Sequence, residues 1–160
     1  MRLAIIAVGR LKDGPERALY LKYAKRVDDA GRAIALGPIA LSEVVEGRQA
    51  GAGQRRADEA ARLLQHTDKA DIAVLLDVDG KAFSSEAFAR WLAARRDEGQ
   101  RSVTFLIGGP DGHGDAAAER AGLKLSLGPM TMPHGLARIV LAEQLYRAAT
   151  ILSGHPYHRA

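Results

Sequence analysis

The sequence predicts an α/β fold in which helices flank a mainly parallel sheet. Five short apolar segments alternate along the chain with segments of helical periodicity. The apolar segments are hydrophobic on both faces, as expected for strands buried inside a sheet. This alternation continues to the end of the chain without an internal repeat, which is typical of a layered α/β domain. We therefore expect residues 1–160 to form a single domain.

The first half of the chain predicts three strands and two helices. The predicted strands are Arg2–Val8, Ala33–Leu41 and Ile72–Leu76. The first helix is expected to start at Asp13-Gly14-Pro15-Glu16, because proline suits a first helical turn and an acidic side chain suits the positive end of the helix dipole. The second helix is predicted over Gln54–Gln65. The apolar stripes comprise Leu19, Tyr20, Tyr23 and Val27 in the first helix, and Ala57, Ala61 and Leu64 in the second.

The second half predicts two strands and three helices. Ser84 or Ser85 is expected to cap a helix whose inner face carries Phe88 and Trp91. The remaining elements are a strand over Ser102–Ile107, a short helix capped by Asp115 and ending at Ala121, a strand over Leu123–Leu127 and a long helix over His134–Ser153.

The composition excludes several classes of protein. The chain has no cysteine, which rules out a disulfide framework and thiolate metal sites. The apolar run Leu3–Val8 is too short for a signal peptide, and no stretch approaches the ~18 apolar residues of a membrane span. We therefore expect a cytoplasmic protein. A formal charge of +4 and a pI near 9.6 favour an acidic partner such as nucleic acid.

Three segments that follow predicted strands are candidates for a ligand site. They are Asp77–Lys81, Gly108–Gly114 and Leu127–Met132. In a parallel sheet, ligands bind beyond the carboxyl ends of the strands. All three segments contain glycine, and Gly108–Gly114 is rich in it, which lets backbone groups approach a ligand closely. We predict a site with backbone contacts and apolar walls; a simple tight turn is the alternative for Gly108 and Gly109.

The middle segment also contains an imperfect dinucleotide-binding fingerprint. Gly112-x-Gly114-x-x-Ala117 follows a strand and opens a helix. Asp115 would place a negative charge against a pyrophosphate, however, and the next strand runs into Leu127-Gly128 without the expected acidic residue. A Gly-Lys-Ser/Thr phosphate loop is absent as well. A dehydrogenase is therefore a minor alternative, and nicotinamide binding would be its signature.

The long C-terminal helix predicts a dimer. Its polar residues do not gather on one face; they are Arg138, Glu143, Gln144, Arg147 and Thr150. A helix that is apolar on several sides needs two covering surfaces, and we predict that the second is another copy of the chain in a symmetric homodimer. Glu143 and Arg147 are four residues apart and also suit a simple ion pair.

The tail after this helix ends on side chains that bind anions or move protons. It reads His155-Pro156-Tyr157-His158-Arg159, where frayed, bland residues are the norm. A solvated surface tail is the alternative for His158 and Arg159. His155 and His158 lack a third ligand at a suitable spacing, so we expect no metal. His134 follows Pro133 at the predicted helix start, where capping and core packing are the alternatives to a functional role.

Six motifs resemble the ribosomal RNA large subunit methyltransferase H family in their order and spacing. They are Ala7-Val8-Gly9, Leu76-Asp77-x-x-Gly80-Lys81, Ile107-Gly108-Gly109, Met130-Thr131-x-Pro133-His134, Glu143-x-x-Tyr146-Arg147-Ala148 and His155-Pro156-Tyr157-His158-Arg159. The resemblance covers nearly the whole chain. It implies a SPOUT-type fold with a C-terminal trefoil knot and a homodimer. It also implies methylation of N3 of a pseudouridine in the 23S ribosomal RNA of the assembled ribosome.

The resemblance also implies roles for particular residues. S-adenosyl-L-methionine would contact Leu76, Gly108, Leu127, Gly128, Pro129, Met130, Thr131 and Met132. Tyr157, His158 and Arg159 would act in catalysis, since the tail would reach the target nucleotide beside the partner's cofactor. His134 and His155 would contact the substrate.

The glycine-rich loop Glu46–Gly53 and its neighbourhood carry basic side chains. Arg48, Arg55 and Arg56 lie in or beside this loop, which is expected to be mobile. We predict that these arginines set a salt-sensitive affinity for RNA. A solvated connector is the alternative for the loop.

The expected chemistry joins a ring anion to a sulfonium cation, so charge is lost as the transition state forms. A site that excludes water favours this change, and alignment of two bound reactants is worth ~7–11 kcal/mol. We favour His158 as general base, with Arg159 holding a phosphate or the ring anion; deprotonation by solvent is the alternative. An RNA-binding module without catalysis is the rival class, and cofactor titration separates the two.

Overall fold

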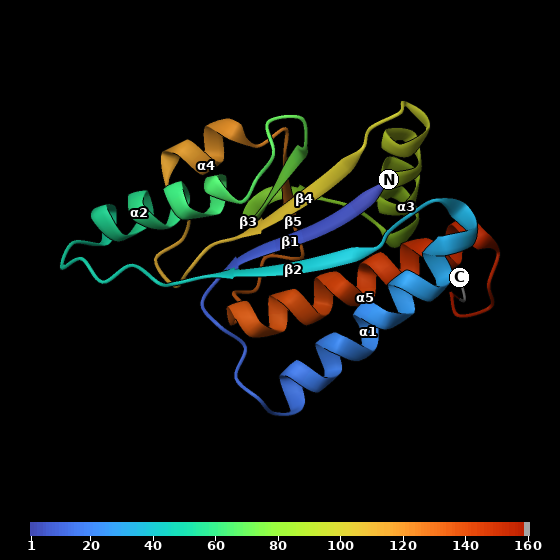
Figure 1. Cartoon of the computed structure of the whole chain (residues 1–160), viewed down its shortest axis with the longest axis horizontal. Coiled ribbons are helices and arrows are strands. Elements are labelled where there is room, and N and C mark those ends of the chain that lie inside the picture. Colours follow the sequence, from blue (N-terminus) through green and yellow to red (C-terminus); the bar gives the residue numbers. More distant parts are fainter. Residues whose placement is uncertain (159–160) are drawn as a thin grey trace.

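The five strands form one fully parallel sheet in the computed structural model, which describes residues 1–158 (Figure 1). In their order across the sheet, the strands are β2 (Ile39–Val44), β1 (Arg2–Val8), β4 (Ser102–Ile107), β3 (Ile72–Ala82) and β5 (Leu123–Ser126). Every adjacent pair is parallel, so all carboxyl ends meet at one edge. The predicted α/β class is confirmed.

Helices cover both faces of the sheet (Figure 1). One face carries α1 (Pro15–Gly31), α3 (Ser85–Asp97) and α5 (His134–Ser153), and the other carries α2 (Ala52–Gln65) and α4 (Asp115–Arg120). The alternation of side chains along β1 explains the two layers. Leu3 and Ile5 belong to the core beneath α1, α3 and α5, whereas Ile6 belongs to the core beneath α2 and α4.

Helix α5 lies at the centre of its layer. It packs against the sheet and is flanked by α1 and α3. From Ala137 to Leu152 every residue of α5 is buried or half-buried within the single chain. The absence of one polar face is therefore explained by neighbours in the same chain. Coverage within the single chain removes this reason to expect a second copy over α5, and the dimer itself stays a prediction.

The second strand begins later than the sequence predicted. Arg32–Ile34 form a 3-10 turn that continues α1, and Ala35 then adopts a left-handed conformation with φ 54°. The backbone N–H of Leu36 donates to the carbonyl oxygen of Gly31, and the side chain of Leu36 is buried. The apolar run that favoured a strand is therefore a buried helix terminus, and β2 begins only at Ile39.

Two helix predictions also need correction. The buried residues of α2 are Glu59, Ala60 and Leu63, while Ala57 and Ala61 are exposed. Alanine occurs on both faces of α2, at Ala60 on the buried face and at Ala57 and Ala61 on the exposed face, so hydrophobicity alone did not distinguish the two faces. In α4 the cap position belongs to Gly114, and Asp115 is the first helical residue. In α3, by contrast, Ser84 is the cap, and its hydroxyl accepts a hydrogen bond from the N–H of Ala87.

Strand β3 is longer than predicted. It pairs with β5 through Leu76 and again through Lys81, and both of these residues are opposite Leu125. The residues between them form a bulge at the carboxyl edge, where the sequence had predicted a loop leaving the sheet. None of the helices in the described part of the chain has the length and apolar character to cross a bilayer.

Candidate cofactor and substrate site

The bulged part of β3 and the segments that follow β4 and β5 enclose one cavity of about 670 Å³ at the carboxyl edge of the sheet. This volume lies within the range of ~300–1,000 Å³ that is usual for small-molecule sites. Its lining includes Leu76, Gly108, Leu127, Gly128, Met130, Thr131 and Met132, all of which were expected to contact a cofactor. Pro129 is not part of this lining. The three segments singled out in the sequence therefore meet in space.

Glycine is required at two lining positions because no side chain fits there. A Cβ atom on Gly108 would lie 2.7 Å from Nδ1 of His113 and 3.0 Å from the carbonyl oxygen of Gly112. A Cβ atom on Gly109 would lie 2.7 Å from Oε2 of Glu59. Gly109 and Gly112 also pair across a tight turn. The tight turn, which was the alternative interpretation of Gly108 and Gly109, is present, and their contact with a ligand stays a prediction.

His113 joins two walls of the cavity. Its Nε2 contacts the carbonyl oxygen of Leu76, so this nitrogen donates and the segment after β4 is tied to the end of β3. Asp77, the next residue of β3, supplies the carboxylate of the lining, which is otherwise mostly apolar. The cavity thus combines apolar walls, accessible backbone and one negative side chain.

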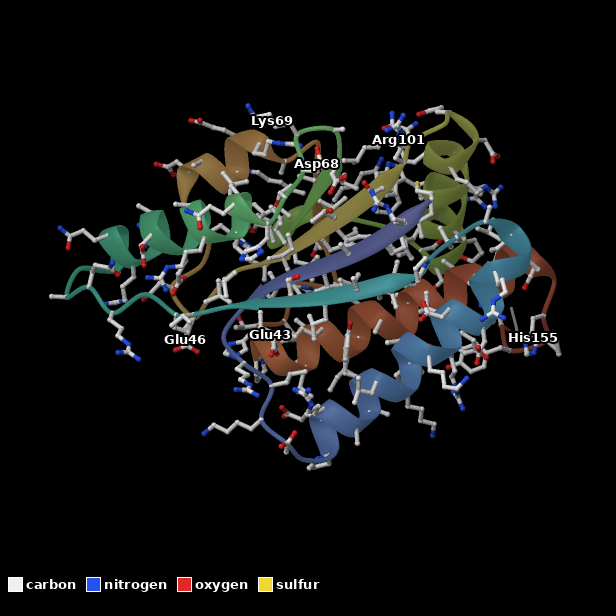
Figure 2. The ribbon with its side chains drawn as sticks, in the orientation of Figure 1. Glu43, Glu46, Asp68, Lys69, Arg101 and His155 are labelled. Atoms are coloured by element: carbon white, nitrogen blue, oxygen red, sulfur yellow. The ribbon has the colours of Figure 1, made fainter. Side chains whose placement is uncertain are left out.

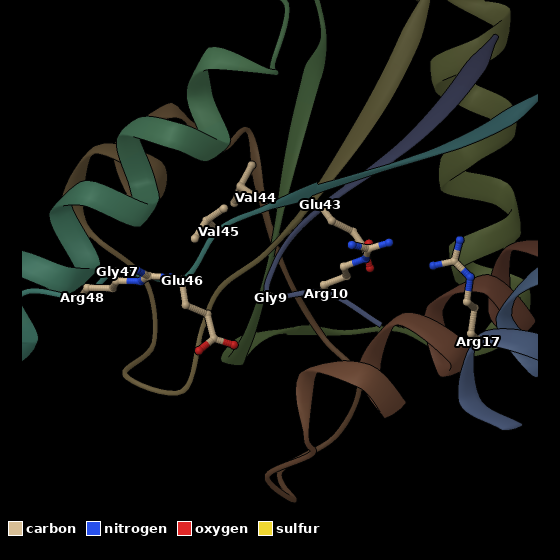
Figure 3. A pocket seen from close by; sticks show the side chains of 9 residues that line it. All are labelled: Gly9, Arg10, Arg17, Glu43, Val44, Val45, Glu46, Gly47 and Arg48. Atoms are coloured by element: carbon tan, nitrogen blue, oxygen red, sulfur yellow. The ribbon is translucent and has the colours of Figure 1, made fainter. Parts of the chain in front are cut away.

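His134 stands at the border of a second cavity. It begins α5 and lines the first cavity, next to Gly9 at the end of β1. Gly9 has φ +81°, and a Cβ atom on it would lie 3.1 Å from Nε2 of His134 and 2.8 Å from Oε1 of Glu46. Gly9 and Glu46 line the second cavity, of about 660 Å³, beyond the ends of β1 and β2 (Figure 3).

Arg138 fastens α5 to this edge of the sheet. Its side chain is 0% exposed, and Nη1 lies 2.7 Å from Oε1 of Glu43 in β2. Its Nη2 donates to the carbonyl oxygens of Val8 and Gly9, both at 2.7 Å. Burial lowers the pKa of the guanidinium, while Glu43 opposes that shift. The first turns of α5, with His134, are thereby positioned between the two cavities.

The tail folds back onto the C-terminal half of α5. The hydroxyl of Tyr157 donates to Oε1 of Glu143 at 3.1 Å, and its ring centroid lies 4.5 Å from that of Tyr146. Arg147 pairs with Glu143 at 2.5 Å and lies 5.0 Å from the Tyr157 ring centroid. Burial and the Glu143 carboxylate raise the pKa of Tyr157 to about 12, so the phenol is neutral at physiological pH. The predicted Glu143–Arg147 ion pair is present and also anchors the tail.

Tyr157 and His158, two of the catalytic residues expected in the tail, lie far from the first cavity of their own chain. His134 begins α5 at the cavity, and the tail follows its last turn, about 30 Å away for a helix of 20 residues (Figures 1 and 2). Nε2 of His158 lies 2.9 Å from Oε1 of Glu86 on α3. His155 is exposed. Arg159 lies outside the described residues.

The three arginines expected to contact RNA have different surroundings. Nε and Nη2 of Arg55 lie 2.6 and 3.2 Å from the carboxylate of Asp111, and Nη1 donates to the carbonyl oxygens of Gln49 and Ala50. This arrangement raises the pKa of Arg55 and lowers that of Asp111. Arg55 therefore fastens the Glu46–Gly53 loop to the cavity segment after β4. Arg56 is half-buried on α2, whereas Arg48 is exposed and lines the second cavity.

Sequence reasoning missed several lining residues. In the first cavity, Ala137 was missed, and His113 was included only as part of the segment Gly108–Gly114, without a role of its own; in the second cavity, Arg10 and Arg17 were missed. A usable signal was present for Arg10, because Gly9-Arg10 follows the first strand at the same edge of the sheet. Within residues 1–158, no group of three histidine, aspartate or glutamate side chains could hold a metal ion.

Comparison with known proteins identifies the class to which this parallel sheet and edge cavity belong. A family model described as "Predicted SPOUT methyltransferase" matches residues 1–158. Curated relatives match over nearly their whole length. The ribosomal RNA large subunit methyltransferase H of Brucella anthropi is 50% identical over 160 residues, covering 100% of both chains. The proteins of that name from Rhizobium leguminosarum and Sinorhizobium medicae are each 51% identical, covering 99% and 100% of both chains.

The chain therefore belongs to the ribosomal RNA large subunit methyltransferase H family of SPOUT methyltransferases. The family predicted from the six sequence motifs is confirmed.

Proposed function

We propose that this protein transfers a methyl group from S-adenosyl-L-methionine to N3 of a pseudouridine in 23S ribosomal RNA. The substrate is the assembled ribosome, and the enzyme acts in the cytoplasm. The observation that carries the proposal is the cavity of about 670 Å³ that three strand-end segments build together. Relatives covering the full chain, named as ribosomal RNA methyltransferases, support the reaction class.

The first cavity fits the cofactor in size and in chemistry. S-adenosyl-L-methionine supplies a methyl group on a positively charged sulfur. Apolar side chains such as Leu76 and Leu125 suit its ring system, and Gly108 contributes backbone to the lining with no side chain of its own. The carboxylate of Asp77 complements the positive charge.

We further propose a symmetric homodimer in which the tail of one subunit completes the cavity of the other. The tail and the first cavity lie at opposite ends of α5, so a second copy offers the simplest way to bring them together. Apolar side chains near the cavity are exposed in the single chain: Met130 is 77% and Leu136 is 44% exposed. Such a surface suits contact with a second subunit. The reason to expect a dimer is therefore the exposure of these side chains and the position of the tail, and no longer the apolar character of α5.

The proposal includes a trefoil knot within a single domain spanning residues 1–160. Its support is the path of the chain between β5 and α5. Strand β5 is at the edge of the sheet, whereas α5 begins beside Gly9 of β1, on the far side of β3 and β4. The connecting segment therefore crosses the carboxyl ends of two strands before α5 begins.

In the reaction, the tail would handle the proton and the charge of the RNA base. His158 would accept the proton from the ring nitrogen, and Arg159 would hold the ring anion or a phosphate. His158 would exchange its contact with Glu86 for the RNA. Tyr157, neutral and anchored on Glu143, would set the direction of the tail.

The test is transfer of labelled methyl to ribosomes that lack the modification, followed by nucleoside mapping. For His158→Ala we expect transfer to fall by about 10²–10⁴-fold, the usual contribution of a general base. Calorimetry should show nearly unchanged affinity for S-adenosyl-L-methionine. His66→Ala is the control, because this exposed histidine lies beyond the end of α2. Equal loss of cofactor affinity in His158→Ala would contradict the assigned role.

A further inference from the structure

The second cavity has a cationic lining for which the proposed chemistry has no use. It occupies about 660 Å³ beyond the carboxyl ends of β1 and β2. Three arginines from separate segments line it: Arg10 follows β1, Arg17 lies in the first turns of α1, and Arg48 belongs to the loop after β2. Figure 3 shows Arg48 on one side and Arg10 and Arg17 on the other.

The charges in this cavity are not balanced. Glu43 also lines it, but Oε1 of Glu43 already faces Arg138 and the backbone N–H of Leu11, each at 2.7 Å. Within residues 1–158, neither Arg10 nor Arg48 takes part in an ion pair. Arg17 donates to the carbonyl oxygen of Leu11 at 3.3 Å, and its ion-pair partner Asp13, at 3.4 Å, is fully exposed to water. Of the two carboxylates that line the cavity in the described part of the chain, Glu43 is engaged by Arg138, so Glu46 is the one that faces Arg10 and Arg48 without such a partner.

The wall that carries Arg48 is held in place from behind. The backbone N–H of Gly47 donates to Oε1 of Glu59 at 2.8 Å, and Glu59 is buried. Arg55, which like Glu59 lies in α2, donates from Nη1 to the carbonyl oxygens of Gln49 and Ala50. These contacts fix the backbone on both sides of Arg48. The loop therefore needs little further ordering when an anion binds.

We propose that this second cavity binds a backbone phosphate of the RNA strand beside the nucleotide that is methylated. The inference rests on the proposed function and adds a substrate contact to it. The two cavities meet at Gly9 and His134, so a base directed to the first cavity would carry its neighbouring phosphates toward Arg10 and Arg48. Guanidinium groups match phosphate oxygens in charge and in geometry. Glu46, at the border, weakens the positive field on the cofactor side.

The test measures binding of the full-length protein to unmodified ribosomes as a function of salt concentration. Arg10→Ala and Arg48→Ala are each expected to make the slope of log affinity against log salt shallower by about 0.7, the loss of one single-strand phosphate contact. Glu46→Gln is expected to tighten binding, because it removes the opposing charge. Arg101→Ala is the matched control, since this exposed arginine precedes β4 at the opposite edge of the sheet (Figure 2).

Several results would overturn the phosphate site. One is an equal change in slope for Arg101→Ala, which would mean that only total charge matters. Another is a loss of S-adenosyl-L-methionine affinity in Arg10→Ala, which would assign the cavity to the cofactor. A third is competition by polyglutamate as strong as that by oligouridylate, which would indicate an acidic protein segment. If Arg10→Ala and Arg48→Ala show the expected slopes but the wild-type protein transfers no methyl, the proposed reaction is refuted and the phosphate site is supported.

Discussion

At two positions of the first cavity, the identity of the residue is set by the space available for a side chain. Gly108 passes so close to His113 and Gly112 that a single added carbon would fall within 2.7–3.0 Å of both. Gly109 meets Glu59 in the same way. The backbone at the end of β4 therefore packs directly against His113, Gly112 and Glu59, with no room for a Cβ atom. This close packing depends on the two glycines and on the polar side chains that lie against them.

Gly108→Ala tests this point. The added methyl group must displace His113 or the backbone of Gly112, and such overpacking typically costs ~1–3 kcal/mol. We expect affinity for S-adenosyl-L-methionine, measured by calorimetry, to fall by about tenfold, or 1.4 kcal/mol. Gly53→Ala is the control, since Gly53 lies in α2 with no atom within 4 Å of its added Cβ. That change should stabilise the fold by ~0.5–1 kcal/mol. Equal cofactor affinity in the two variants would contradict the argument.

Among the elements, α5 connects the cavities at its first turn to the tail after its last. Its position depends on Arg138, a fully buried cation whose hydrogen bonds reach β1 and β2. Burying a charge is unfavourable, and here one carboxylate and two carbonyl oxygens offset that cost. The same carboxylate, Glu43, lines the second cavity. One side chain of α5 therefore shapes the surroundings of both candidate sites.

We expect Arg138→Met to destabilise the protein by about 3–5 kcal/mol in urea unfolding, because Glu43 loses its cationic partner and the carbonyl oxygens of Val8 and Gly9 lose the guanidinium donor. The control is Lys25→Ala, which removes an exposed ion pair with Asp29 on α1 and should cost less than about 1 kcal/mol. If the two variants had similar unfolding free energies, Arg138 would not be the anchor of α5.

At the scale of the whole molecule, the tail and the first cavity are separated by the length of α5. Residues of the tail up to His158 are docked on α3 and α5, at the end of the molecule away from Glu43 and Glu46 (Figure 2). In a twofold dimer, each copy would contribute its tail to the other's cavity, giving two equivalent composite sites.

Mixed dimers provide the test. Gly108→Leu blocks the first cavity and His158→Ala removes the base, so we expect each variant alone to be nearly inactive. Co-expressed in equal amounts, they should recover about a quarter of wild-type methyl transfer, since half of the dimers would carry one intact composite site. No recovery in isolated mixed dimers would show that each tail serves its own chain. Each variant expressed alone provides the baseline.

Much of this architecture is predictable from local pattern. Ser102–Ile107 and His134–Ser153 match β4 and α5 to the residue, because a short, mostly apolar and β-branched segment and a proline before a long helical segment are strong local signals. The three cavity segments follow from one general rule about the carboxyl ends of parallel strands. The family was also within reach, since its motifs are short and lie in a recognisable order.

Other features depend on contacts between distant residues, and no local pattern contains them. The inward face of α2 is set by Glu59, which meets Gly47 and approaches Gly109. Arg55 was assigned to RNA because it is basic, but its charge is engaged by Asp111, 56 residues further on. The second cavity forms only where Arg10, Arg17 and Arg48 converge. Local sequence encodes backbone preference and burial, whereas the partner of a charge is chosen by the packing of the complete fold.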